Sequence, residues 1–99
     1  MTIVVDTVGG ALGGIPDCGN GVHAFLGIPY AAPPVGMLRW RPPLPAPPWQ
    51  GIRMATRAAP RCIQHQPYGE LEPDNPAMSE DCLYLNVWTQ SSSSNAALP

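Results

Sequence analysis

The sequence predicts a β-rich chain in which short strands are joined by long irregular segments, with no convincing long helix. The 99 residues include 14 prolines and 10 glycines, which interrupt helices and favour turns and extended connections. The apolar runs are short, and one of them alternates polar and apolar residues with the period of a strand. A chain of this length is one small domain at most, or part of a larger one.

Two strands are expected in the first third of the chain. Residues 3–8 form a β-branched run that stops at the glycine pairs of residues 9–14, which are interpreted as turn glycines. Residues 22–28 form a second extended run after the turn signal Gly19-Asn20-Gly21. Together these runs predict an antiparallel hairpin or meander.

A proline-rich segment follows at residues 29–48, where eight of the 14 prolines lie. Such a segment is neither a helix nor a central strand. Apolar residues are spread through it, so we expect it to run over the rest of the protein. Its stretch 42–48 contains P-x-x-P spacing, which could bind an aromatic groove of another protein. Folding against its own protein is the favoured interpretation, because arginine and tryptophan flank the stretch.

The last third of the chain contains one further strand. Residues 61–75 are polar and loop-like, whereas residues 83–89 alternate apolar and polar side chains, which predicts a strand. The serine tract at residues 91–95 predicts a flexible, exposed loop.

Composition and charge exclude several functional classes. Five arginines and no lysine stand against seven acidic residues, for a net charge of −2. This balance argues against binding to nucleic acid or to anionic membranes. No apolar run approaches the roughly 20 residues that span a bilayer. Because no signal peptide is visible, the cytoplasm is favoured, although three cysteines leave the redox compartment open.

The sequence offers no convincing cofactor or metal site. The glycines of residues 9–14 follow a strand, but they miss the dinucleotide fingerprint and no amphipathic helix follows them. Cys62, His65 and Cys82 provide only one close pair of soft ligands, and His23 lies far away in the sequence. We therefore expect neither a metal nor a cofactor.

The sequence also lacks the residues needed for nucleophilic catalysis. No G-x-S-x-G motif is present, and Ser79 precedes two carboxylates that do not favour its deprotonation. The neighbouring acids Glu80 and Asp81, like the nearby Glu70 and Glu72, rarely flank one bond. The chain is therefore predicted to carry no complete active site.

Two long motifs are distinctive enough to indicate a protein family. Residues 25–40, FLGIPYAAPPVGMLRW, and residues 79–88, SEDCLYLNVW, resemble two segments near the start of type-B carboxylesterases. Between them, residues typical of the family occur in its order: Trp49-x-Gly51, Ala55-Thr56 and Cys62-x-Gln64. The resemblance implies an α/β-hydrolase fold in the whole protein and ester hydrolysis through a Ser-His-Glu/Asp triad.

The same resemblance implies a place for this chain within that fold. Residues 1–99 match the N-terminal part of an incomplete α/β-hydrolase domain, with residues 90–99 as a flexible linker before a missing strand. The family's catalytic positions lie downstream, so none is carried over to this chain, which alone is expected to be inactive. The implied substrate is a small-molecule carboxylic ester. The alternatives are a non-catalytic adhesion or binding relative of the fold, and a truncated product without independent function.

Two structural pairs are also implied by the resemblance. The family pairs the arginine and the glutamate at the positions of Arg39 and Glu80, here expected to be partly buried. Many members form a disulfide at the positions of Cys62 and Cys82, and both the oxidised and the reduced state remain open here. The loop between these cysteines is short, and its only aromatic candidate for a ligand-stacking role is Tyr68. The resemblance therefore favours a general carboxylesterase of the para-nitrobenzyl esterase kind over acetylcholine specificity.

Overall fold

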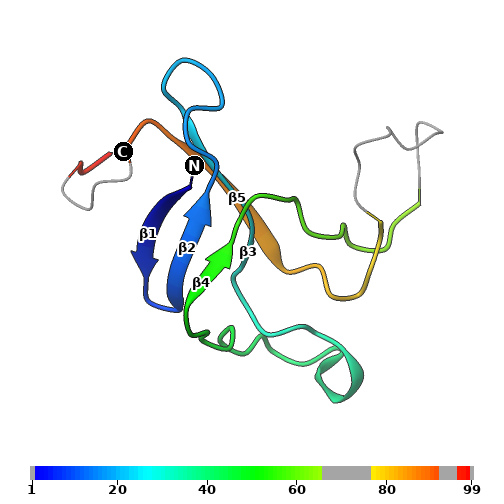
Figure 1. Ribbon diagram of the computed structural model, residues 1–99. Helices are drawn as coiled ribbons and strands as arrows, with labels where there is room; N and C mark the ends of the chain where they lie inside the picture. The colour runs from blue at the N-terminus through cyan, green and yellow to red at the C-terminus, as the bar shows by residue number, and fades with distance from the viewer. Residues whose placement is uncertain (1, 66–76, 92–95, 99) are drawn as a thin grey trace.

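In a computed structural model of the chain, the structure describes residues 2–65, 77–91 and 96–98. These residues form five short strands and one turn of 3₁₀ helix (Figure 1). The elements are β1 (Ile3–Thr7), β2 (Gly10–Gly14), β3 (His23–Pro29), η1 (Gly36–Leu38), β4 (Ile52–Met54) and β5 (Tyr84–Thr89). The prediction of a β-rich chain with little helix is thus confirmed over the described residues.

Strands β1, β2 and β4 form a three-stranded sheet, in that order. β1 and β2 are antiparallel, with Ile3 opposite Gly14, whereas β2 and β4 run parallel. The Thr7 hydroxyl closes the β1–β2 turn, because it donates to the Gly10 carbonyl at 2.6 Å and accepts from the Gly10 amide at 3.2 Å. Of the two expected arrangements, a direct hairpin between residues 3–8 and 22–28 is wrong, since β1 pairs with the glycine run between them. The meander is closer, because the chain just after this run in turn forms an antiparallel bridge with β3.

Two glycines explain why β2 is a strand despite its composition. A Cβ atom on Gly14 would lie 2.6 Å from two ring carbons of Phe25, so only a residue without a side chain admits this ring. A Cβ on Gly10, whose φ is 145°, would lie 2.6 Å from Nε1 of Trp49. The interpretation of residues 9–14 as turn glycines thus fails over β2, where close packing favours glycine.

Strands β3 and β5 form a second, antiparallel sheet, in which His23 lies opposite Thr89. The register shifts between Phe25 and Ile28. At this irregularity Gly27 has a φ of 71°, and its amide donates to Oδ1 of Asn86 at 2.9 Å. The strand expected at residues 83–89 is confirmed as β5, although its partner is β3 and not a sequence neighbour.

The two sheets meet where β2 continues toward β3. Ile15 and Ala24 exchange two backbone hydrogen bonds of 2.8 and 2.9 Å across an isolated antiparallel bridge. The buried cluster beside this junction is small, and partly buried apolar side chains pack against it. The buried members are Leu12, Phe25 and Ala55; the partly buried ones are Ile3, Val5, Ile28 and Trp49.

The proline-rich segment (residues 29–48) leaves β3, turns at η1 and returns toward β4 as one long loop (Figure 1). Midway, the Ala32 amide donates to the Leu44 carbonyl at 3.0 Å. Just after the segment, the Trp49 amide donates to the Gly9 carbonyl at 3.0 Å and its ring nitrogen donates to the Ala11 carbonyl at 2.7 Å. The segment is therefore closed on itself by one hydrogen bond, and Trp49 ties its end to the region of β1 and β2.

Candidate functional site

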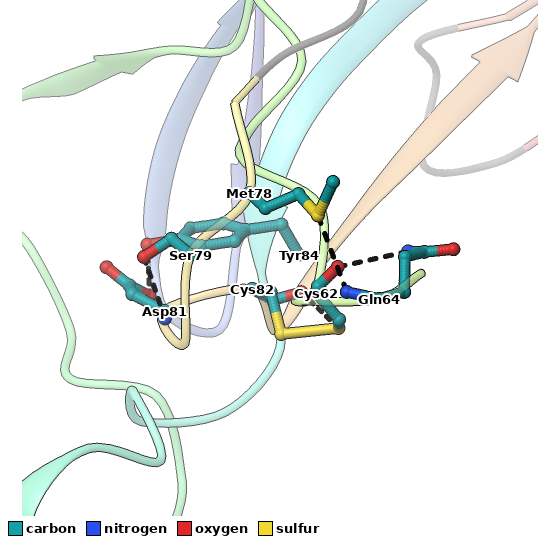
Figure 2. Close-up of a disulfide and its surroundings, with 7 residues drawn as sticks. All are labelled: Cys62, Gln64, Met78, Ser79, Asp81, Cys82 and Tyr84. Atoms are coloured by element: carbon teal, nitrogen blue, oxygen red, sulfur yellow. Dashed lines mark hydrogen bonds between the residues drawn. A yellow bond between two sulfur atoms is a disulfide. The ribbon is translucent and has the colours of Figure 1, made fainter. Parts of the chain in front are cut away.

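Four of the residues that the sequence singled out lie around one disulfide: Cys62, Ser79, Asp81 and Cys82 (Figure 2). Residues 77–79 lie beside Arg61, whose amide donates to the Ala77 carbonyl at 3.0 Å and whose carbonyl accepts from the Ser79 amide at 2.8 Å. Next to this bridge, Cys62 and Cys82 form a disulfide, with their Cα atoms 5.0 Å apart. The structure thus has the oxidised form of the pair that the sequence left open.

A short polar chain continues from the disulfide to β5. The Asp81 amide donates to Ser79 Oγ at 3.1 Å, and the Tyr84 hydroxyl donates to Asp81 Oδ1 at 2.9 Å (Figure 2). Burial, then the hydrogen bond to Asp81 and the charge of that carboxylate, raise the pKa of Tyr84 above 10.0, while Arg53 acts in the opposite direction. In this arrangement Ser79 accepts a local backbone hydrogen bond, which shapes the turn and does not activate its hydroxyl.

Arg39 and Glu80 lie together, with Nε and Oε1 2.9 Å apart. Their side chains are 58% and 43% exposed in this chain, and Trp40, next to Arg39, is 99% exposed. Burial of the pair in the whole protein stays a prediction. Solvent-exposed ion pairs contribute at most about 1 kcal/mol, and this is the contribution we expect of the pair in the 99-residue chain.

The candidate metal ligands do not form a site. The sulfur atoms of Cys62 and Cys82 are bonded to each other, His65 is exposed, and Nδ1 of His23 accepts the Asp17 amide at 3.1 Å. No group of three or more histidine, cysteine or acidic side chains within the described ranges could hold a metal ion. The candidates Tyr68, Glu70 and Glu72 lie outside the described residues, as does most of the serine tract.

A hollow of about 530 Å³ opens between the two sheets, and its lining is largely apolar. It is lined by Val4, Val5, Asp6, Thr7, Leu12, Phe25, Ile28, Val87, Thr89 and Ser91. None of these side chains is a histidine, cysteine or lysine, so the hollow has no nucleophile–base pair of the usual kind. Its chemistry is that of a packing surface.

Trp49, which flanks the proline-rich stretch, packs on the chain as expected, but sequence reasoning missed that it does so on the glycines at the start of β2. Its ring lies against Gly9 and Gly10, donates to the Ala11 carbonyl, and has the guanidinium carbon of Arg53 5.6 Å from its centroid. The available signal was the pairing of a large aromatic residue with a run of glycines, which together permit close approach.

A disulfide-closed loop, an Arg–Glu pair and a long proline-rich segment thus lie on a small β framework. The chain belongs to the carboxylesterase family, because the model of that family, described as "Carboxylesterase family", matches residues 2–99. The resemblance identified from the two sequence motifs is therefore confirmed.

Individual relatives agree with this assignment. The chain is 45% identical over 97 residues to fumonisin B1 esterase of Sphingopyxis macrogoltabida, covering 98% of this chain and 17% of that protein. It is 52% identical over 80 residues to acetylcholinesterase of Gallus gallus, covering 73% and 10%. A solved structure of PNB esterase superposes with a TM-score of 0.79 at 40% identity, covering 93% of this chain and 19% of that one. The chain thus spans less than a fifth of the length of these relatives.

Within the described ranges, none of the helices has the length and apolar character needed to cross a membrane.

Proposed function

We propose that this chain serves as the N-terminal portion of a serine carboxylic-ester hydrolase with the α/β-hydrolase fold. The observation that carries the proposal is the family match over residues 2–99. In such an enzyme a serine attacks the ester carbonyl, the alcohol leaves, and water releases the acid from the acyl-enzyme. The proposed substrate is a small-molecule carboxylic ester, and the catalytic residues lie outside residues 1–99.

The packing of the chain supports this role as part of a larger body. Only five apolar residues are buried among those described, and six of the ten residues that line the hollow between the sheets are apolar. Large apolar side chains of β4 and β5 are exposed, including Met54 at 55% and Trp88 at 59%. Exposed apolar surface of this kind is typical of a face that packs against further structure.

The proposal is tested on the chain and on the longest reading frame that contains it. The 99-residue chain is assayed with para-nitrophenyl acetate and a fluorophosphonate probe, and we expect neither turnover above a boiled control nor covalent labelling. The product of the reading frame is expected to hydrolyse the ester and to be labelled on a serine outside residues 1–99. Turnover by the purified 99-residue chain would overturn the placement of the catalytic residues. A reading-frame product without turnover or labelling would favour a binding relative of the fold.

A further inference from the structure

Residues 41–48 of the proline-rich segment have no part in the proposed ester hydrolysis. Every residue from 41 to 48 is either a proline or precedes one. Proline fixes its own φ, and the residue before a proline is restricted to extended conformations. The stretch accordingly has no helix or strand in the structure and no positive φ. Its backbone is therefore predisposed to the polyproline II conformation, which makes no internal hydrogen bonds.

The stretch is exposed in this chain. All of its residues are exposed except Ala46, and Leu44 retains half of its accessible surface, at 50%. A polyproline II helix has three residues per turn, so prolines three apart share an edge. Pro42, Pro45 and Pro48 have this spacing and give two overlapping P-x-x-P repeats.

Both ends of the stretch are held in place. Upstream, the Arg41 amide donates to the Leu38 carbonyl at 3.2 Å; downstream, Trp49 is bound through its amide and its ring nitrogen. In the middle, the Leu44 carbonyl accepts from the Ala32 amide. A partner would therefore meet a pre-ordered ligand and lose little conformational entropy on binding.

Charge selects the kind of partner. Arg39 is engaged by Glu80, but Arg41 is exposed and has no ion-pair partner among the described residues. A cation beside a P-x-x-P repeat complements an acidic rim on an aromatic-lined groove, the type of groove that recognises such peptides.

We propose that residues 41–48, here named the docking ridge, bind a partner domain that has an aromatic-lined groove with an acidic rim. The prolines of the docking ridge fill the spaces between the groove's aromatic rings, and Arg41 pairs with the rim. This inference goes beyond the proposed ester hydrolase, and it rests on the docking ridge staying uncovered in the longer protein that the proposed function describes.

The test uses the full 99-residue chain and a panel of purified SH3 and WW domains, with binding measured by calorimetry. At least one domain is expected to bind, with its groove aromatics shifting in NMR spectra. Pro42→Ala combined with Pro45→Ala should weaken that binding by about tenfold or more, as loss of a central anchor does. The matched control is Pro16→Ala combined with Pro60→Ala, which leaves the docking ridge intact and should bind like the parent chain.

A second pair of variants tests the charge. Arg41→Gln should weaken binding by about threefold or more and flatten its salt dependence, because the pair with the acidic rim is lost. Arg57→Gln removes an exposed arginine outside the docking ridge and should leave the affinity unchanged. The proposal is overturned if no domain of the panel binds, or if binding survives the two proline substitutions with undiminished affinity.

Discussion

The two ends of this small molecule are stabilised in different ways. At the sheet junction, packing is close because glycines leave room for the aromatic rings of Phe25 and Trp49. At the disulfide end, the segments around Cys62 and Cys82 are joined by a covalent bond, an exposed ion pair and local hydrogen bonds. The buried apolar cluster belongs to the first region, whereas both bridged cysteines are partly or fully exposed.

This difference teaches that a chain with little core can use two independent strategies. Packing stabilises the native state directly through buried apolar area. A disulfide in an exposed region acts mainly on the unfolded chain, by restricting its conformations. Substitutions in the two regions should therefore differ in size and in their response to reductant and salt.

The largest effect is expected at the sheet junction. Phe25 is 3% exposed, and Phe25→Ala should lower the free energy of unfolding by about 3–5 kcal/mol, enough to abolish the folded state of a chain with so small a core. Urea unfolding followed by circular dichroism measures this. Trp88→Ala removes a larger aromatic side chain that is 59% exposed, and it should cost far less. Equal losses in the two variants would contradict the contrast between the regions.

The disulfide should have the next largest effect. The bridge spans 20 positions in the sequence, and closing a loop of that size stabilises by about 3 kcal/mol in the chain-entropy model. Cys62→Ser combined with Cys82→Ser should lower the unfolding free energy by that amount, and added reductant should have no further effect on this variant. Cys18→Ser, which removes the free exposed cysteine, is the matched control. In the denatured but unreduced parent chain, thiol titration should count one thiol; a count of three would show that the bridge does not form.

How far the sequence predicted the fold depends on whether local pattern or tertiary packing sets each element. The alternation of residues 83–89 was sufficient for β5, and two motifs identified the family over nearly the whole chain. The sequence did not predict β2, because glycine has low strand propensity. The need for glycine at position 14 becomes evident only from the folded structure, where the ring of Phe25 packs against it. The pairing of β3 with β5 joins segments about 60 residues apart, a distance at which no local signal acts. The Arg39–Glu80 contact followed from the resemblance, but its exposure depends on surrounding packing that the pattern does not contain.

A steric test sharpens the description of the junction. Gly14→Ala places a methyl group against the Phe25 ring and 2.7 Å from the Ala24 carbonyl, and overpacking of this kind costs about 1–3 kcal/mol. Because Phe25→Leu makes room, the double variant should lose less than the sum of the two single losses. Additive losses would mean that the ring does not determine the glycine at this position.

A smaller effect is expected for the exposed ion pair. Arg39→Ala should lower the unfolding free energy by less than about 1 kcal/mol, because both partners are substantially solvated. A double-mutant cycle with Glu80→Gln isolates the pair, and its coupling should shrink further as salt is raised. A coupling of several kcal/mol that resists salt would show that the pair is buried in solution.

The smallest effect on stability is expected at Tyr84 of β5, whose hydroxyl binds Asp81 near the disulfide. Burial and the bond to Asp81 raise its pKa in the folded chain above 10.0, so the unfolded chain loses this proton first as the pH rises. Between the two pKa values the folded state binds more protons, and linkage then requires stability to fall with increasing pH. The unfolding free energy of the parent chain should therefore decline above pH 10 more steeply than that of Tyr84→Phe. Absorbance at the tyrosinate band should show one residue that titrates late in the parent chain and is missing from the variant. Parallel stability profiles would mean that the hydroxyl is solvated, and that the polar chain from Ser79 to β5 does not persist in solution.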